Sequence, residues 1–423
     1  YVLIMIGSIL VNFFAGLLMD KQSTQGRRRA VLVVGIVLNL AALGVFKYAG
    51  LFVSTLREIP GLSSLPEVDI ALPIGISFYT FQAVSYLIDV YWDDCAASHN
   101  LINFASYISL FPQLIAGPIV RYKDVNEQLV SRRETPTLFN SGVRLFVVGL
   151  AKKVLLANQF GMLWDAMSAD PVAAGALGAW AGACAYTLQI YFDFAGYSDM
   201  ARGLGRMLGF EFCINFNYPY ISRSITEFWR RWHMTLSSWF REYLYIPLGG
   251  NRVKPWRMYF NLFAVWACTG FWHGASWNFV FWGLYYGMFI FFEMLIGKKR
   301  MKKMPVPLAH IYTKLVIFIG FGIFYFENLG SLGTFFKALV GANGNKLTDT
   351  VTQHLFMNNI WLFAAAVLFT MPVIPKIKEK ALSAKGTAYF MQSAGIICNA
   401  AILVLSSVLL VNTTNNPFLY FRF

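Results

Sequence analysis

The sequence predicts an all-α, polytopic membrane protein, and three observations support this fold class. The 423 residues are 57% hydrophobic and only 13% charged, whereas soluble domains are closer to half apolar and a quarter charged. The apolar runs are roughly 17–25 residues long, which is the length of a membrane-crossing helix and not of a short alternating barrel strand. The basic residues cluster between these runs, as they do in membrane proteins with several spans.

The chain divides into apolar segments with short polar connections. The first segment lacks the basic start and small-residue cleavage site of a signal peptide, so we expect a span there and further residues before it. The segment 258–296 is too long for one span and predicts a helical hairpin. The full set of expected spans is 1–19, 30–56, 70–92, 139–168, 172–200, 258–296 as a hairpin, 309–328, 356–375 and 387–412.

The basic clusters predict the orientation. Connections such as Arg57-Glu-Ile-Pro-Gly61 and Ser168-Ala-Asp-Pro171 carry few Lys or Arg, whereas the connections that alternate with them are rich in both. Because Lys and Arg accumulate in cytoplasmic loops, the clusters belong to the cytoplasm and the net charge of +14 needs no nucleic-acid partner. The clusters lie within 21–29, 121–133, 202–257, 298–303 and 376–385.

These clusters share one side only if the segment 101–120 does not cross the membrane. Its Phe111-Pro-Gln-Leu-Ile-Ala-Gly-Pro118 contains two prolines and a glycine, which break helices. Irregular backbone is tolerated at membrane depth only when protein surrounds it. We therefore predict a re-entrant hairpin over 101–120, about ten to eleven transmembrane or re-entrant helices in total, and residues 412–423 outside the cytoplasm.

Residues 227–244 have a sharp helical period. Apolar and aromatic side chains and His233 recur every three or four positions, while Arg, Ser and Glu fill most of the others. This pattern predicts an amphipathic helix at the cytoplasmic interface, anchored by Trp and Arg. His233 is then either a polar member of an interfacial helix or a functional residue, and spacing alone leaves both open.

His273 lies in the middle of the 258–296 hairpin, within Gly270-Phe-Trp-His-Gly-Ala-Ser-Trp-Asn278. An ionisable side chain at bilayer depth is costly, which makes it a functional candidate. The small residues around it let helices approach closely and would open a channel beside the imidazole. A neutral imidazole can take a proton from a hydroxyl that attacks a thioester. The alternative is a buried histidine that holds two helices together.

Asp193 and Asp199 lie near the end of the 172–200 segment. Asp199 and Arg202 are three positions apart and could pair on one helix face. Asp193 lies deeper, and structural pairing is the alternative to a functional role for it as well. Arg252 and Lys254 either contact donor phosphates or only follow the positive-inside pattern.

Other chemical signals are weak. The five cysteines are scattered and predict neither zinc binding nor a disulfide framework. The remaining histidines lie in connecting segments and predict solvated loops: His99, His310 and His354. The sequence contains no GxSxG elbow, P-loop or dinucleotide fingerprint.

Six segments of the chain form an ordered series of motifs. They are Leu72–Gln82, Phe111–Pro118, Tyr191–Arg202, Phe228–Ser237, Tyr245–Arg252 and Phe271–Trp277, and the chain closes on Asn416-Pro-Phe-Leu-Tyr-Phe-Arg-Phe423. In this order they resemble the motifs of the membrane-bound O-acyltransferases (the MBOAT family), in their bacterial alginate O-acetyltransferase-like branch. The resemblance extends from about residue 30 to the end of the sequence.

The resemblance implies helices around a thin central region, pierced by a tunnel from a cytoplasmic donor side to an outer acceptor side. It implies that His273 is the essential histidine and His233 a second, supporting one. No metal and no bound cofactor are implied, since the thioester donor, acetyl-CoA or an acyl carrier protein, is a substrate. Within the motifs we expect substrate contacts from Asp193, Asp199, Arg231, Trp232, Asn251, Arg252, Trp272 and Ser276.

Together these expectations predict one integral-membrane acyltransferase domain over 1–423, located in the bacterial cytoplasmic membrane. It would move an acyl group, in the simplest case acetyl, to a hydroxyl of an extracytoplasmic polysaccharide, directly or through an extracytoplasmic partner protein. One alternative is transfer of D-alanine from a carrier protein to teichoic acid. An alternative of another class is a polysaccharide or lipid transporter whose histidines only line a path, and thioester consumption separates it from an enzyme.

Overall fold

A computed structural model describes residues 1–383, 388–411 and 417–419, and these residues form helices and connections without a β-strand. Among them, six helices are long and apolar enough to cross a membrane, or seven if one bent pair counts as a span. The predicted multi-pass helical protein is thereby confirmed. The six are Val2–Asp20, Gln25–Arg57, Pro136–Ser168, Trp277–Ile296, Val306–Tyr325 and Gln392–Val411.

The N-terminal helices surround α4 (Ile76–Tyr91), which is buried at every position from Ile76 to Val90. Around it pack α1 (Val2–Asp20) and α2 (Gln25–Leu43), which continues through the π-helical turn η1 (Gly44–Tyr48) into α3 (Ala49–Arg57). α4 has 16 residues and is shorter than the expected span 70–92. It is therefore a helix enclosed by protein, with polar positions that lipid would not tolerate.

Polar contacts fix the packing of this N-terminal group. Asn12 and Asn39 exchange amide hydrogen bonds of 3.0 and 2.7 Å between α1 and α2, as polar side chains do between membrane helices. Arg28 pairs with Asp93 at 2.6 Å beyond the end of α4. The hydrogen bond from Arg28 holds the pKa of the Asp93 carboxyl below its ordinary value.

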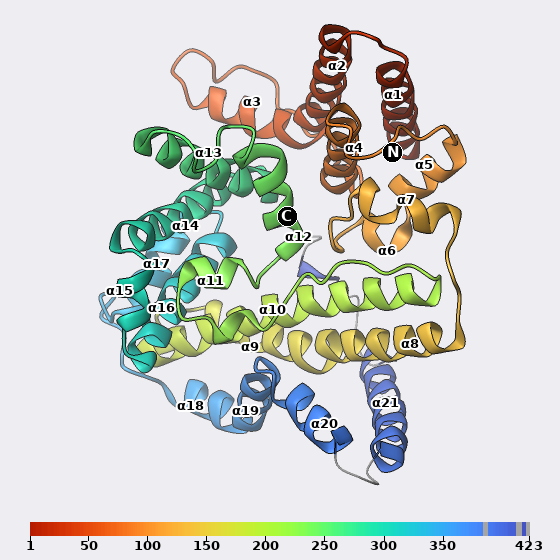
Figure 1. The fold of residues 1–423 in the computed structure, drawn as a ribbon. Coiled ribbons are helices and arrows are strands. Elements are labelled where there is room, and N and C mark those ends of the chain that lie inside the picture. The colour runs from red at the N-terminus through yellow and green to blue at the C-terminus, as the bar shows by residue number, and fades with distance from the viewer. Residues whose placement is uncertain (384–387, 412–416, 420–423) are drawn as a thin grey trace.

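A long helical hairpin crosses the middle of the molecule (Figure 1). One arm is α8 (Pro136–Ala151), η2 (Lys152–Ala157) and α9 (Asn158–Ser168), and the other is α10 (Gly175–Met207). Glycines let the two backbones touch, since a Cβ built on Gly149 would lie 2.6 Å from the carbonyl oxygen of Gly196. The hairpin confirms that the expected segments 139–168 and 172–200 are helical.

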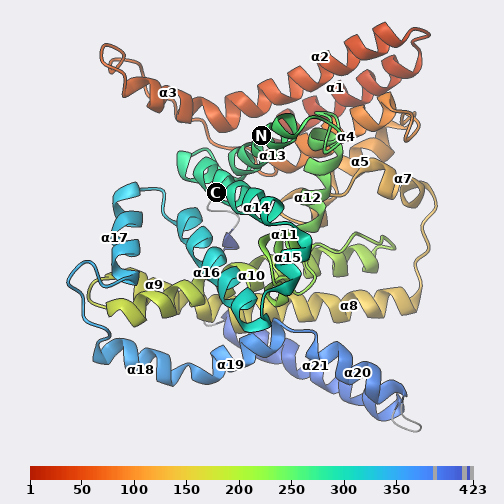
Figure 2. The same ribbon diagram turned by 60° about the vertical axis from the view of Figure 1, so that its left-hand side comes forward.

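The C-terminal helices lie on the opposite side of this hairpin from α1 and α2 in both views (Figures 1 and 2). They are α18 (Thr350–Asn358), α19 (Ile360–Phe369), α20 (Val373–Ser383) and α21 (Ala388–Val411). The expected span 356–375 is not one straight helix, because α18 and α19 meet at a bend of 51° and α20 begins within the expected bounds. The bent pair is apolar enough to form one broken span, so a crossing there stays a prediction.

The segment 101–120 is broken, as its prolines and glycine predict. It forms α5 (Leu101–Ser109) and α6 (Phe111–Leu114), and irregular backbone leads on to α7 (Tyr122–Val130). Gln113 is fully buried, and its Nε2 donates to the Tyr107 carbonyl at 2.7 Å. A Cβ on Gly117 would lie 2.9 Å from the Pro112 oxygen, so the turn requires glycine there. The side of the membrane that it faces stays a prediction.

The remaining helices pack mainly on one another, and the last two of them also pack against α10. They are α11 (Ile225–Trp229), α12 (Met234–Phe240), the π-helical turn η4 (Arg241–Tyr245), α13 (Pro255–His273), α14 (Trp277–Ile296), α15 (Lys298–Lys303), α16 (Val306–Tyr325) and α17 (Leu329–Leu339). The predicted hairpin over 258–296 is confirmed, with its turn at Gly274–Ser276 between α13 and α14.

The prediction of one amphipathic helix over 227–244 is wrong. The chain leaves α11 after Trp229 and starts α12 at Met234, and His233 between them has φ of 44°. The apolar face was identified correctly, but Trp229, Trp232 and Trp239 are buried within the protein rather than laid on a bilayer surface. Tertiary contacts around His233 override the local periodicity.

Candidate active site

His233 and His273 face each other at the centre of the fold, with 6.4 Å between their ring centroids. His233 is the N-cap residue of α12, and His273 is the last residue of α13. Trp272 lies beside both, with its ring 6.2 Å from His233 and 5.1 Å from His273. Two helix termini thus bring together the two histidines that the sequence singled out.

His233 is held in the left-handed region of backbone conformation, which non-glycine residues seldom adopt. The strained turn is fixed by Asn215, whose carbonyl accepts from the Met234 N–H at 2.9 Å. The Asn215 side chain also hydrogen-bonds the imidazole, with 3.1 Å between Nδ1 of His233 and Oδ1 of Asn215.

The hydrogen bonds around Asn215 select the tautomer of His233. The Thr235 N–H can only donate, and it lies 3.3 Å from the same Oδ1, so this atom is the amide oxygen. Nδ1 of His233 must therefore carry the proton, which leaves the Nε2 lone pair free. This Nε2 is buried and has no hydrogen-bond partner among the described residues, which is unusual for a buried polar atom.

The segment predicted to be re-entrant contributes to this network. Thr235 Oγ1 donates to Asn215 at 2.9 Å and accepts from the Ile119 N–H at 3.0 Å. The irregular backbone after α6 thereby holds Thr235, Asn215 and His233 in one chain of hydrogen bonds. A mixed network of this kind fixes a side chain better than packing alone.

His273 lies within a ring of aromatic side chains. Trp282 and Phe324 meet its imidazole edge-on, at 4.9 and 5.6 Å between centroids. Its Nε2 is buried and has no hydrogen-bond partner in the described chain. The expected channel beside Gly274 is not formed there, because the Phe279 ring occupies that space, 2.1 Å from a Cβ placed on this glycine. The small residues serve close packing of α13 on α14 instead.

Lys47 holds the end of α13, although nothing in the sequence patterns had singled it out as a site residue. Its Nζ donates to the Trp272 carbonyl at 2.5 Å and to Ser77 Oγ at 3.2 Å, and the side chain is 8% exposed. Next to it, the Tyr48 hydroxyl donates to the Phe271 carbonyl at 2.7 Å. Carbonyls at a helix C-terminus lack intrahelical partners, and a cation there is favourable. A lysine inside the apolar run 30–56 was the signal that could have revealed it.

Among the expected substrate contacts, Trp272 and Ser276 lie at the site. Trp272 Nε1 donates to the Ser77 carbonyl at 3.3 Å, and Ser276 is the N-cap residue of α14 in the turn after His273. Trp232 is 3% exposed, and its ring packs on Phe216 and Phe321, so it supports the fold behind His233.

Asp193 and Asp199 are both engaged in ion pairs between the arms of the central hairpin. Lys153 lies 2.5 Å from Asp193, and Lys152 lies 2.6 Å from Asp199. Arg202 is a second partner of Asp199 at 3.5 Å. Asp193 also accepts from the Leu419 N–H at 2.9 Å, which ties the C-terminal residues into the interior. Structural pairing accounts for both carboxylates, and their substrate role stays a prediction.

Within the described part of the chain, the other expected contacts, Asn251, Arg252 and Arg231, make no hydrogen bond or ring contact with either histidine. Asn251 and Arg252 are exposed in the loop between η4 and α13. Arg231 bonds Glu227 at 3.0 Å and the Asn217 carbonyl at 3.2 Å. No three His, Cys, Asp or Glu side chains of the described residues gather where they could hold a metal ion.

A cavity of about 580 Å³ approaches the histidine pair between α11, α12 and α13. Met234, directly after His233, and Thr269, one helical turn before His273, line its wall. Arg230 and Arg241 contribute positive charge, and both side chains are exposed. The cavity therefore runs from a basic surface to residues that lie next to His233 and one turn from His273 in the chain, although neither histidine lines it.

Comparisons with known proteins agree with this architecture. The family model described as the membrane-bound O-acyltransferase family matches residues 95–332. A Pseudomonas aeruginosa protein named "Probable alginate O-acetylase AlgI" is 44% identical over 345 residues, which are 80% of this chain and 66% of that protein. A protein of the same name from Azotobacter vinelandii is 39% identical over 446 aligned residues, which cover 97% of this chain and 89% of that protein. A Helicobacter pylori protein named "Peptidoglycan O-acetyltransferase" is 33% identical over 477 aligned residues, which cover 100% of this chain and 88% of that protein.

Proposed function

Because this chain belongs to the membrane-bound O-acyltransferase family, and is therefore a multi-pass membrane O-acyltransferase, we propose that it acetylates an extracytoplasmic polysaccharide. The donor is a cytoplasmic thioester, either acetyl-CoA or an acetylated carrier protein. The acceptor is a sugar hydroxyl, reached directly or through an extracytoplasmic partner protein. The names of the relatives support acetyl as the acyl group and a cell-surface polysaccharide as the acceptor. The enzyme would work in a bacterial cytoplasmic membrane.

The observation that carries this proposal is the pair of neighbouring imidazoles whose Nε2 atoms are both buried and have no hydrogen-bond partner among the described residues. In the proposed reaction, Nε2 of His273 takes the proton from the acceptor hydroxyl as its oxygen attacks the thioester carbonyl. A C–O bond forms, the C–S bond breaks, and the thiolate leaves with a proton returned by the imidazole. His233, whose tautomer Asn215 selects, supports this step from the opposite side of the site.

The cavity of about 580 Å³ is the proposed path of the acyl arm. Arg230 and Arg241 would meet the phosphates of the donor, while the acyl end passes Met234 and Thr269 towards the imidazoles. The large anionic part of the donor thus stays at the surface, and only its thin arm enters the aromatic interior. Holding both reactants in one narrow space removes much of the entropic barrier to their reaction.

The test is acetyl transfer by purified protein in nanodiscs. Radiolabelled acetyl-CoA and an acetylated carrier protein are supplied separately, with an uronate polysaccharide or peptidoglycan fragments as acceptor, with and without the candidate partner protein. Thioester consumption that requires His273 supports the proposal. Consumption of a D-alanyl carrier thioester with no use of either acetyl donor would establish the D-alanyl alternative instead. The transporter alternative does not survive the family assignment.

A further inference from the structure

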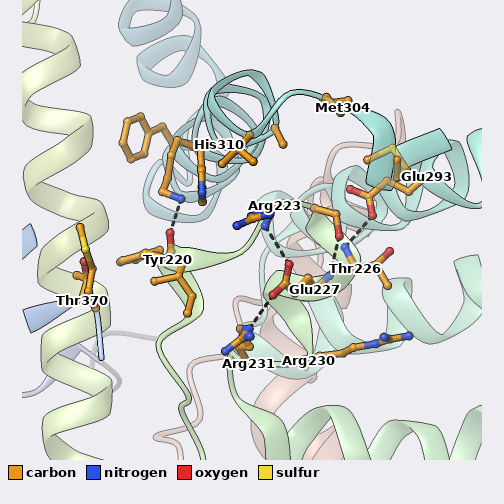
Figure 3. A pocket seen from close by; sticks show the side chains of 18 of the residues that line it. Tyr220, Arg223, Thr226, Glu227, Arg230, Arg231, Glu293, Met304, His310 and Thr370 are labelled. Carbon is orange, nitrogen blue, oxygen red and sulfur yellow. Dashed lines mark hydrogen bonds and ion pairs between the residues drawn. The ribbon is translucent and has the colours of Figure 1, made fainter. Parts of the chain in front are cut away.

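A second and larger cavity, of about 1310 Å³, lies between α10, α11, α14, α15, α16 and α19. Figure 3 shows its polar wall, where Arg223, Glu227 and Arg231 form a connected group beside Glu293. The cavity shares only Thr226 and Arg230 with the proposed acyl path, and neither His233 nor His273 lines it. The two cavities thus adjoin at Thr226 and Arg230, and the rest of their walls is made by different residues.

Positive charge dominates the polar wall of this cavity. Six Lys or Arg side chains line it against two Glu. Both carboxylates are already engaged: Glu293 accepts from the Ile225 and Thr226 N–H groups at 2.5 and 2.8 Å, and Glu227 accepts from Arg231 at 3.0 Å. The uncompensated charge therefore calls for an anionic ligand.

Four of these cations have side chains with neither a hydrogen-bond partner nor an ion-pair partner in the described part of the chain. Lys314 donates to the Tyr220 carbonyl and Arg231 pairs with Glu227. No side-chain hydrogen bond or ion pair within that part of the chain engages the others, which are Arg223, Arg230, Lys298 and Lys302. Unpaired guanidinium and ammonium groups around one cavity are the usual means of holding a phosphate.

Part of the wall of the cavity is apolar and open. Met294, Val306, Val367 and Met371 line it and are 39%, 43%, 47% and 40% exposed. They belong to or adjoin α14, α16 and α19, of which α14 and α16 are candidate membrane spans. Exposed methionine and valine side chains at the ends of spans suit the acyl chains of a lipid, whereas a soluble nucleotide would gain little from them.

His310 belongs to this cavity as well. The sequence analysis expected it in a solvated loop, but it lies in α16 and lines the cavity next to Lys314. Even a neutral imidazole carries one N–H group, which would add a further donor for an anionic oxygen. The expectation failed because α16 starts at Val306, earlier than the apolar run suggested.

We propose that this cavity binds the phosphate head group of an anionic phospholipid, with the acyl chains leaving over the apolar wall. Basic pockets between membrane helices on the cytoplasmic side recognise such head groups. The site does not depend on the proposed acetyl transfer. Because Glu293 in the same wall binds the N-terminus of α11, which leads to His233, a bound lipid would also stabilise the approach to the active site.

Helix α15 offers a matched pair of variants. Lys298 and Lys302 line the cavity four positions apart, whereas Lys299 and Lys303 on the same helix do not. All four side chains are exposed, so neither double substitution should disturb folding. The cavity variant is Lys298→Gln/Lys302→Gln, and the control is Lys299→Gln/Lys303→Gln, with the same loss of charge.

The measurement is native mass spectrometry of protein released from nanodiscs that contain phosphatidylglycerol and phosphatidylcholine in equal amounts. We expect the wild type and the control to retain phosphatidylglycerol selectively, and the cavity variant to retain it on the order of tenfold less. Equal retention by cavity variant and control, or retention of both lipids alike, would overturn the proposal.

A kinetic measurement separates the lipid from the donor as occupant. If the cavity held the donor phosphates, the cavity variant would raise the KM for acetyl-CoA in detergent without lipid, and phosphatidylglycerol retention would stay at the wild-type value. That result would also overturn the proposal. Because lipid retention is measured without turnover, its outcome is independent of whether the acetyl-transfer assay succeeds.

Discussion

Asn215 Oδ1 lies 3.1 Å from Nδ1 of His233 and thereby leaves Nε2 of this buried imidazole unprotonated. The contact joins a loop residue after α10 to the N-cap of α12, and Thr235 supports it from the same side. The tautomer is thus built into the fold before any substrate arrives. It gives the site a buried lone pair close to His273, whose own Nε2 has no hydrogen-bond partner among the residues that the structure describes.

His273→Ala is expected to abolish acetyl transfer, with a loss on the order of 10²–10⁴-fold from the missing general base. The buried aromatic ring around the site remains, so membrane insertion and amounts of protein should stay near those of the wild type. Turnover of the labelled thioester is the measurement. Near wild-type turnover in this variant would remove His273 from the reaction.

His233→Ala should lower turnover strongly but leave a measurable rate, because His233 supports the step that His273 performs. Asn215→Ala is the companion variant. It keeps the His233 side chain but removes the acceptor that holds the proton on Nδ1, so either ring nitrogen can carry the proton. We expect Asn215→Ala to lower kcat with little change in the KM for the donor. If both variants behaved like a change at a distant surface residue, the proposed pairing of the histidines would be wrong.

Lys47→Met is expected to lower kcat on the order of 10²-fold, since it releases the Trp272 carbonyl and shifts the end of α13 that carries His273. Tyr48→Phe loses one neutral hydrogen bond of about 1 kcal/mol while keeping the ring stacked on Phe271, so its effect should be smaller. The KM for the donor should change little in either. Full activity of Lys47→Met would make this lysine a bystander.

The segment 202–257 is expected to face the cytoplasm. Ser238 and Lys254 are exposed, so a cysteine at either position should resist a membrane-impermeant thiol reagent in intact cells and react in inverted vesicles. The exposed native cysteines, Cys213, Cys268 and Cys398, must be replaced first. Labelling from outside the cell would place the donor cavity on the wrong side and overturn the proposed direction of transfer.

The re-entrant path of 101–120 predicts that its two flanks lie on the same, cytoplasmic, side. Ala96 and Ser131 are exposed on either flank, and single cysteines there should give the same labelling pattern. Opposite patterns would show that this segment crosses the membrane. Every later span would then be inverted, and the basic clusters would lie outside, against the usual distribution of Lys and Arg.

Much of the fold could be predicted because apolar length and basic connections act locally along the chain. The hairpin around Gly274 and the helices over 139–168 and 172–200 followed from this pattern. The break between α18 and α19 did not, since no proline or glycine marks the bend at Asn359. The composition of α4 predicts a membrane span, but neighbouring helices enclose it.

The sequence by itself determined that this is a helical membrane protein and singled out two histidines as candidates, because burial cost makes ionisable groups in apolar runs conspicuous. Only the tertiary structure decided where the two imidazoles lie and which groups hydrogen-bond them. Backbone hydrogen bonds to Asn215 force His233 into a left-handed turn that its helical periodicity contradicts. Contacts between distant segments, such as Lys47 with Trp272 and Ile119 with Thr235, fix both imidazoles. Residue spacing along the chain cannot encode such contacts, since each depends on how separate helices pack.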